Sequence, residues 1–276
     1  MLKFYKYQGA GNDFLIADNR DGSICLTEEQ IAALCDRRYG IGADGLMLLE
    51  NSDEYDFRMV YYNSDGSGGM MCGNGGRCIV AFAADMGITN FDFDAADGFH
   101  TAKVLSTDGK SKVVTLKMKD VSVCDSYDSL TGTDVPSDGY FLDTGTRHYV
   151  RFVDGLDEYD IVTEGRDIRW NAEELKPVGA NVNYVEPAGG LLKVRTYEKG
   201  VEDETFACGT GIVASCVAAF KAGVTPSSVA GNCVTYEVKA KRDRLSVSFM
   251  PDPEGLVKSV YLTGPATFVA EICISL

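Results

Sequence analysis

A short motif occurs twice in this chain at a fixed spacing, and this repeat constrains the fold more than any other feature. The motif Cys-Gly-x-Gly begins at Cys72 and again at Cys208, an offset of 136 residues in a chain of 276. Four further pairs share that offset: Gly9 and Gly145, Asp18 and Asp154, Glu50 and Glu186, Gly87 and Gly223. Matching residues that keep both their order and their spacing predict a duplicated domain.

Alternating apolar and polar residues predict a chain built mainly of strands. We expect strands at Leu2–Tyr7, Phe14–Asp18, Phe57–Tyr62, Lys112–Lys117, Tyr149–Val153, Val182–Glu186, Leu191–Tyr197, Val234–Lys239, Leu245–Phe249 and Thr267–Ile274. Two helices are predicted, at Arg77–Met86 and Ile212–Ala222. Both are apolar nearly all round, and such helices must be buried on every side. The capping-box sequence at Thr27–Gln30 predicts a third helix to about Arg38.

The repeat and the two buried helices together predict an α/β (α+β) fold of two pseudo-symmetric domains. Each domain is expected to hold one of these helices at the centre of a sheet-built core. We expect an N-terminal domain over residues 1–120 that carries Cys72 and is completed by a C-terminal strand at 265–276. The second domain, over residues 121–264, carries Cys208, and the polar, turn-rich stretch Ser122–Gly139 is the best candidate for a linker.

Composition excludes several classes of function. The chain is 45% apolar and 24% charged, which is ordinary for a soluble globular protein. Its net charge of −15 makes nucleic acids and anionic membrane surfaces unlikely partners. No apolar run reaches the roughly 18 residues of a membrane span, and the first residues lack a signal-peptide pattern. We therefore expect a cytoplasmic protein.

Nine cysteines are many for such a chain, but they suggest neither a disulfide framework nor a metal site. There is no Cys-x-x-Cys pair, and the two histidines, His100 and His148, are far from any cysteine in the sequence. Most of the cysteines are expected to be buried packing residues, including Cys78 and Cys216.

Cys72 and Cys208 are different because each precedes a glycine-rich helix start. Exposed backbone N–H groups and the helix dipole make such a start an anion site, and they also favour a thiolate. A duplicated domain brings two of these loops to one cleft. There, one thiolate removes a proton from a substrate α-carbon while the opposite thiol protonates the other face, which inverts the centre. Helix amides hold the carboxylate as negative charge develops, and no cofactor is needed.

Six blocks of sequence, spread nearly from end to end, resemble the diaminopimelate epimerase family. They are Gly9–Phe14, Arg38–Gly45, Asn63–Ser67 with Cys72–Cys78, Gly179–Asn183, Tyr197–Gly200 and Glu204–Gly211. The resemblance implies two similar domains, each a curved, mostly antiparallel sheet wrapped around a central helix. It also implies cofactor-independent epimerisation of LL-diaminopimelate to meso-diaminopimelate, in lysine and peptidoglycan precursor synthesis. The partner is then a small-molecule substrate, and a homodimer is compatible with the family.

The resemblance also assigns residues to the site. Cys72 and Cys208 are implied as the two bases, supported by His148 and Glu198. The reacting carboxylate is implied to bind at Gly73-Asn74 and Gly209-Thr210. The residues implied to hold the rest of the substrate are Asn12, Asn63, Thr146, Asn181, Glu198 and Lys199.

The chain departs from the family pattern at three places. Gly45 stands where many members have Gln, so one side-chain contact is missing. Many members have Gly-Asn-Pro-His where this chain has Gly145-Thr146-Arg147-His148, and the side chain of Thr146 is shorter than that of Asn. Lys199 replaces an arginine and loses its bidentate fork, for which Arg147 is a candidate substitute.

Other functions are compatible with parts of the pattern. Proline racemases and hydroxyproline epimerases share the two-thiol plan, but they usually have Gly-His where this chain has Gly73-Asn74. Phenazine-biosynthesis-type isomerases of this fold lack the paired thiols. A thiol hydrolase with His148 as base leaves the second cysteine unexplained. A redox sensor that forms a Cys72–Cys208 disulfide is the non-enzymatic alternative. The simplest alternative is that His148 is a core residue and the three asparagines are turn residues.

Overall fold

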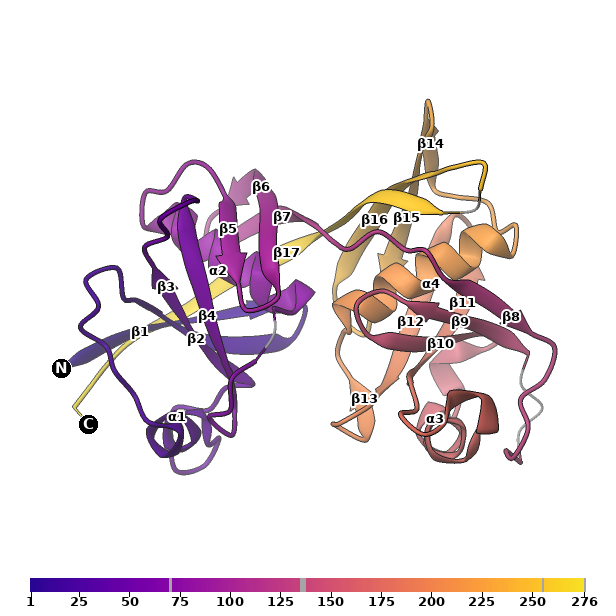
Figure 1. The fold of residues 1–276 in the computed structure, drawn as a ribbon, viewed down its shortest axis with the longest axis horizontal. Coiled ribbons are helices and arrows are strands. Elements are labelled where there is room, and N and C mark those ends of the chain that lie inside the picture. The colour runs from indigo at the N-terminus through magenta and orange to yellow at the C-terminus, as the bar shows by residue number, and fades with distance from the viewer. Residues whose placement is uncertain (70, 135–137, 255, 276) are drawn as a thin grey trace. The chain divides into compact units, whose positions relative to one another are not determined.

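The computed structural model describes residues 1–69, 71–134, 138–254 and 256–275. The chain divides into two compact units (Figure 1). The first consists of Met1–Lys117 together with Thr263–Leu276, and the second of Met118–Leu262. Both units are α/β structures in which parallel and antiparallel strand pairs are mixed.

The strands of the first unit pair in a closed ring. In chain order the elements are β1 (Leu2–Gly9), β2 (Asn12–Asp18), α1 (Glu28–Cys35), β3 (Gly45–Glu50), β4 (Phe57–Asn63), α2 (Gly73–Asp85), β5 (Asp92–Ala95), β6 (Gly98–Asp108) and β7 (Ser111–Lys117). The first unit also contains the end of β17 (Val257–Ile274). Each of β1 to β6 pairs with the strand that follows it, and β17 closes the ring by pairing with both β7 and β1.

Helix α2 lies inside this ring. It contacts β1, β2, β3, β6 and β7, and every residue from Gly73 to Ala83 is buried. Helix α1 packs instead on the outer face of the strands, over Phe4, Leu15 and Leu46. The burial predicted from the apolar sequence is confirmed for residues 77–83, whereas Ala84 and Met86 are partly buried and Asp85 is exposed.

The second unit repeats this plan. Its elements are β8 (Cys124–Tyr127), β9 (Gly139–Asp143), β10 (Arg147–Phe152), η1 (Leu156–Glu158), α3 (Ile161–Asn171), η2 (Glu173–Leu175), β11 (Asn181–Ala188), β12 (Leu191–Glu198), β13 (Asp203–Thr205), α4 (Gly209–Lys221), β14 (Ser228–Ala230), β15 (Cys233–Lys239) and β16 (Arg244–Pro251). Helix α4 contacts β9, β10, β11, β12 and β16 and is buried over almost its whole length.

The two buried helices keep the offset found in the sequence. They begin at Gly73 and Gly209 and end at Asp85 and Lys221, 136 residues apart at both ends. Each is followed by a glycine with positive φ, at 86° for Gly87 and 75° for Gly223, as expected of C-caps. The parallel pair β2–β3 likewise has its counterpart in the parallel pair β10–β11.

All ten predicted strands are present, but several predicted boundaries differ. Helices α2 and α4 begin four and three residues earlier than predicted, inside the glycine runs. Packing explains these glycines, since a Cβ at Gly76 would lie 2.7 Å from a methyl carbon of Leu116. Helix α1 has the predicted capping box but ends at Cys35, because Asp36 accepts hydrogen bonds from the backbone of Arg38 and Tyr39.

Two features of the second unit differ from the sequence analysis. The predicted linker Ser122–Gly139 is wrong: the unit boundary lies at Lys117/Met118, and β8 pairs with β9 inside the second unit. Residues 135–137 of that stretch lie outside the described residues. Helix α3 was missed because its sequence is polar and contains Gly165, where a Cβ would lie 2.6 Å from the Cβ of Tyr197.

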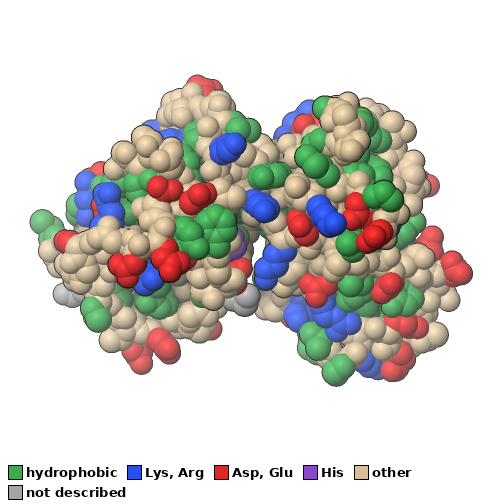
Figure 2. All heavy atoms as spheres, turned by 45° about the horizontal axis from the view of Figure 1, so that its top comes forward, with side chains coloured by type: hydrophobic (Ala, Val, Ile, Leu, Met, Phe, Trp, Pro, Cys, Tyr) green, Lys and Arg blue, Asp and Glu red, His purple; other side chains and the backbone are tan. Residues whose placement is uncertain are grey.

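Charged side chains of both signs are interspersed on the face shown in Figure 2, and no extended basic region is visible among the residues described there. Within the described ranges, no helix combines the length and the apolar character needed to cross a bilayer.

Candidate active site

Cys72 lies at the N-cap of α2. The backbone N–H groups of the first turn of a helix have no carbonyl partner in a preceding turn. Its Sγ accepts a hydrogen bond from the Gly75 backbone nitrogen at 3.2 Å. A Cβ at Gly75 would be 3.3 Å from that sulfur, so glycine allows the close approach. The Cys72 side chain is only partly buried, in contrast to Cys78 one turn and a half further along, which is fully buried.

A buried arginine fixes the orientation of Asn74. Arg77 is fully buried, and its guanidinium donates to the Gly73 carbonyl oxygen at 3.0 Å and to Asn74 Oδ1 at 2.9 Å. Because Oδ1 accepts from Arg77, the amide nitrogen is the end of Asn74 that can donate to a ligand. Arg77 also adds positive charge to the helix start, which favours an anion there.

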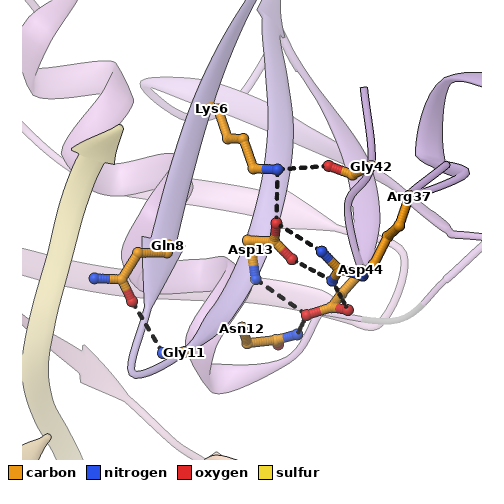
Figure 3. A network of polar contacts seen from close by, with 8 residues as sticks. All are labelled: Lys6, Gln8, Gly11, Asn12, Asp13, Arg37, Gly42 and Asp44. Atoms are coloured by element: carbon orange, nitrogen blue, oxygen red, sulfur yellow. Dashed lines mark hydrogen bonds and ion pairs between the residues drawn. The ribbon is translucent and has the colours of Figure 1, made fainter. Parts of the chain in front are cut away.

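Asn12 is held by a network of charged side chains (Figure 3). Its Nδ2 donates to Asp44 Oδ2 at 2.5 Å, and Asp44 also accepts from the Asp13 backbone nitrogen and from Arg37. Asp44 offers only acceptors, so the Asn12 amide must turn its nitrogen to Asp44. Its carbonyl oxygen is then the end that can accept a hydrogen bond from a ligand.

The same network carries an ionised Asp13. Burial raises the pKa of this carboxyl, but the hydrogen bonds and charges of Arg37 and Lys6 outweigh burial and hold the pKa below its usual range. Lys6 also donates to the Gly42 carbonyl oxygen at 2.6 Å, which ties the loop before β3 to β1. The network therefore fixes the start of β2 and β3 around Asn12 (Figure 3).

Asn63 ends β4 and opens a turn. Its Nδ2 donates to Ser67 Oγ at 3.0 Å, and its backbone pairs with Ser67 and Gly66. The turn predicted for this asparagine is therefore present. Its Oδ1 faces Gly69, where a Cβ would be 3.2 Å away.

The first unit thus gathers the predicted residues at one end of its strands. Asn12 begins β2, Gly45 begins β3 and pairs with Asn63 at the end of β4. The β1–β2 turn packs on the first turn of α2, since a Cβ at Gly9 would be 3.0 Å from the Asn74 carbonyl oxygen.

Cys208 occupies the matching N-cap position of α4 in the second unit. Its Sγ lies 3.4 Å from Thr210 Oγ1. Thr144 Oγ1 donates to the Thr210 carbonyl oxygen at 3.1 Å and anchors this helix start to the turn before β10. Cys216, further along α4, is fully buried, and burial raises the pKa of its thiol well above the usual value.

His148 lies beside this helix start, with polar partners at both ring nitrogens. Its Nε2 is 2.9 Å from Thr146 Oγ1 and 3.0 Å from Thr210 Oγ1. Its Nδ1 is 3.1 Å from Asn183 Nδ2. His148 is fully buried, and burial lowers the pKa of its imidazole to about 3, so the ring is neutral at physiological pH.

Asn183 determines which nitrogen of His148 carries the hydrogen. Thr196 Oγ1 donates to Asn183 Oδ1 at 2.9 Å, so the amide nitrogen is turned toward His148 and the Tyr149 carbonyl oxygen. His148 Nδ1 must then accept, and in a neutral imidazole Nε2 is the donor. The Thr146 and Thr210 hydroxyls, 3.1 Å apart, accept from Nε2 and can pass their own hydrogens on. The chain of hydrogen bonds ends at the contact between Thr210 Oγ1 and Cys208 Sγ, in which either atom can be the donor.

Asn181 and Lys199 are joined through the backbone. Asn181 Oδ1 accepts from the Lys199 nitrogen at 2.9 Å, and its Nδ2 donates to the Arg147 carbonyl oxygen at 3.1 Å. Asn181 thereby fixes the turn after β12, where Glu198 and Lys199 lie. The Arg147 side chain has other contacts: it donates to the Leu175 carbonyl oxygen and its guanidinium lies 5.0 Å from the centre of the Phe141 ring.

Sequence reasoning missed four residues that support the site: Asp44, Arg77, Asn183 and Thr196. A signal was present for three of them. Asp44, Arg77 and Asn183 lie inside quoted motifs, and Asn183 lies between the apolar residues Val182 and Tyr184 of its strand, which predicts a buried hydrogen-bonding role. The described residues contain no group of three or more His, Cys, Asp or Glu side chains suited to a metal ion.

Solved structures share this fold. The chain is similar over its full length to a phenazine biosynthesis protein of the PhzF family from Bacillus anthracis, with a TM-score of 0.72, 15% identity and 99% of that chain covered. It is also similar to a probable proline racemase from Agrobacterium radiobacter, with a TM-score of 0.67, 15% identity and 93% of that chain covered. The fold is therefore that of the PhzF and proline racemase structures.

Sequence comparison gives the family. The model of the diaminopimelate epimerase family matches residues 4–123 and 140–269. A diaminopimelate epimerase from Flavobacterium psychrophilum is 42% identical, over 99% of this chain and 100% of its own length. One from Chlorobaculum tepidum is 45% identical, over 95% of this chain and 96% of its own length. The chain belongs to the diaminopimelate epimerase family, a family of isomerases.

Proposed function

We propose that the chain converts LL-diaminopimelate to meso-diaminopimelate, with Cys72 and Cys208 acting on opposite faces of one α-carbon. One observation supports this most strongly. The two partly buried thiols occupy the same N-cap position on two helices whose first and last residues are each 136 residues apart. In this proposal the units are a pseudo-symmetric pair, and each supplies one thiol to the same substrate.

The reaction is a proton exchange that balances without an outside reagent. One cysteine, as thiolate, takes the α-proton and becomes a thiol. The C–H electron pair remains on the substrate as a carbanion conjugated with its carboxylate. The other cysteine then donates its thiol proton to the opposite face and becomes a thiolate, so the enzyme ends with its two cysteines exchanged in protonation state.

Each helix start is proposed to stabilise the carboxylate as it takes up this charge. In the first unit the donors are the backbone of Gly73-Asn74 and the amide nitrogen of Asn74, which Arg77 orients. In the second they are Gly209-Thr210 at the start of α4. Neutral His148, with Nε2 as donor, supports the Cys208 thiolate through Thr146 and Thr210.

The rest of the substrate is proposed to bind to Asn12, Asn63, Asn181, Glu198 and Lys199. The orientation of Asn12 agrees with this role, because its carbonyl oxygen can accept from an ammonium group. Asn181 contributes by fixing the turn that presents Lys199. We place the reaction in the cytoplasm and in lysine biosynthesis, and the nine free cysteines of the structure agree with a reducing compartment.

The structure disfavours the hydrolase alternative. In that mechanism a histidine nitrogen accepts the thiol proton directly. Here the acceptor nitrogen of His148 is bound to Asn183, and the donor nitrogen contacts two threonine hydroxyls.

Proton NMR in D2O under reducing conditions tests the proposal, with LL-diaminopimelate and L-proline in parallel. Loss of the α-proton signal and appearance of the meso isomer are expected with diaminopimelate alone. Exchange of proline instead would keep the two-thiol chemistry and overturn the substrate. No exchange with either substrate, from folded and reduced protein, would overturn the proposal.

A further inference from the structure

Glu202 has a backbone conformation that residues other than glycine rarely adopt. Its φ is 59°, in the left-handed region. It closes the turn between β12 and β13, where its backbone nitrogen donates to the Glu198 carbonyl oxygen at 2.8 Å. Glycine would adopt this conformation without strain, so a glutamate here indicates that the side chain makes contacts that offset the strain.

The Glu202 carboxylate makes such contacts inside its own turn. Oε1 accepts from the Gly200 backbone nitrogen at 3.0 Å, and Oε2 accepts from the hydroxyl of the fully buried Tyr197 at 3.1 Å. Burial raises the pKa of this carboxyl, but the hydrogen bonds from Gly200 and Tyr197, with the charge of Arg169, outweigh burial and hold the pKa below its usual range. The carboxylate is therefore ionised and can accept both hydrogen bonds.

Two consecutive backbone N–H groups of the turn are held by two different side chains. The nitrogen of Lys199 donates to Asn181 Oδ1 at 2.9 Å, and that of Gly200 donates to Glu202. Asn181 belongs to β11, whereas Glu202 lies at the end of the turn itself. Together they hold the backbone from which the Lys199 side chain extends.

Helix α3 contacts the same turn through Arg169. The Arg169 side chain is 11% exposed, and its Nε lies 3.6 Å from Glu202 Oε1. Arg169 also packs on the segment before β11, because a Cβ at Gly179 would overlap its guanidinium and would be 2.6 Å from its carbonyl oxygen. Gly179 precedes Asn181 by two residues. One arginine therefore supports both segments that hold Lys199.

We propose that Glu202, supported by Arg169, is a positioning residue that holds Lys199 in place for the non-reacting end of the substrate. This inference rests on the proposed function. Glu202 acts through the backbone of the turn and does not itself bind the substrate. The non-reacting end takes no part in the proton exchange, so Lys199 contributes equally to binding in the ground state and in the transition state. Loss of the Glu202 carboxylate should therefore raise KM and leave kcat nearly unchanged.

Glu202→Gly removes the carboxylate and leaves a residue that adopts the observed φ freely. Ser259→Gly is the matched control, because Ser259 also has a positive φ, at 52°, and belongs to the same unit, but lies in β17. With LL-diaminopimelate, Glu202→Gly is expected to raise KM about tenfold and to change kcat less than about threefold. Ser259→Gly is expected to leave both within about twofold.

Glu202→Gln gives a graded test of the carboxylate. The glutamine side chain has one oxygen in place of two, so it can accept from either Gly200 or Tyr197 but not from both. Its KM is expected to lie between those of the wild type and Glu202→Gly. A KM for Glu202→Gln above that of Glu202→Gly would contradict the role of the two hydrogen bonds.

Hydrogen exchange followed by NMR separates positioning from a general loss of stability. In Glu202→Gly, the backbone amides of Lys199 and Gly200 should exchange at least about tenfold faster, whereas those of α4 should keep their wild-type rates. An unchanged KM, unchanged exchange at these two amides, or equally faster exchange in α4 would each overturn the inference. Wild-type protein that fails to turn over LL-diaminopimelate would instead remove the proposed function, and with it the role of the turn in substrate binding.

Discussion

Nδ1 of His148 and the amide nitrogen of Asn183 lie 3.1 Å apart, and both side chains are fully buried. Because Thr196 fixes the amide, the neutral imidazole must carry its hydrogen on Nε2. We therefore infer that Asn183 is a positioning residue, connected to Cys208 through His148 and the two threonine hydroxyls. This relationship leads to the first prediction.

In Asn183→Leu, the hydrogen of the neutral His148 ring should no longer be confined to Nε2. We expect kcat to fall by about tenfold to a hundredfold, because Nε2 then no longer always donates to the threonine hydroxyls beside Cys208. The nitrogen-15 NMR signals of the imidazole should change from the pattern of an Nε2–H ring. Ser215→Ala is the control, since Ser215 is equally buried but donates only within α4, to the Gly211 carbonyl oxygen. An unchanged ring signal in Asn183→Leu would contradict the assignment.

Folding stability should fall in acid because of His148. The folded imidazole has a pKa of about 3, whereas the unfolded one titrates near its ordinary value of 6.5. The unfolded state therefore binds an extra proton between these values, and stability is lost as pH falls from about 6.5 toward 3, by at most about 1.4 kcal/mol per pH unit. In denaturant unfolding at several pH values, the free energy of unfolding of His148→Gln should depend less steeply on pH over this range than that of the wild type.

Replacing either cysteine at a helix start should abolish epimerisation. Cys72→Ser and Cys208→Ser nearly keep the side-chain size. A serine hydroxyl is far too weak an acid to be deprotonated here and so cannot act as the base, and kcat is expected to fall by at least about a thousandfold. Cys25→Ser and Cys273→Ser are suitable controls because both residues are exposed, and their activity should match wild type. A Cys72→Ser or Cys208→Ser variant with near-normal turnover would rule out the two-base reaction.

Asp44→Asn should weaken substrate binding more than it slows the reaction. The new amide can present a donor to Asn12, which frees the Asn12 side chain to turn over, and it also weakens the contact with Arg37. We expect KM to rise by about tenfold, with a smaller change in kcat. Asp18→Asn, at the other end of β2 and paired with Arg20, is the matched control, and kinetics with LL-diaminopimelate compare the two variants.

Most of the strand and helix pattern was accessible from the sequence because burial imposes periodicity. Residues 77–86 and 212–222 are apolar nearly all round, a pattern that predicts a buried helix, and the structure confirms burial for residues 77–83 and 212–219. Helix α3 was not accessible in this way. It buries only Ile161, Gly165 and Ile168, and the close packing of Gly165 on Tyr197 depends on a strand distant in sequence.

The candidate site was predictable only as far as its motifs reached. Cys72 and Cys208 were identified from the repeat, and the resemblance supplied most of the polar residues around them. The orientations of Asn12, Asn74 and Asn183 could not be predicted, because each depends on a tertiary partner: Asp44, Arg77 and Thr196, respectively.

Strand β17 has a consequence for the order in which the two units can form during synthesis. The second unit, Met118–Leu262, is one continuous stretch of chain. The first unit lacks the strand that joins β7 to β1 until residues 264–274 have been made. On the ribosome, therefore, the unit whose sequence begins first is completed last, and the edges of β1 and β7 stay open until the final segment emerges.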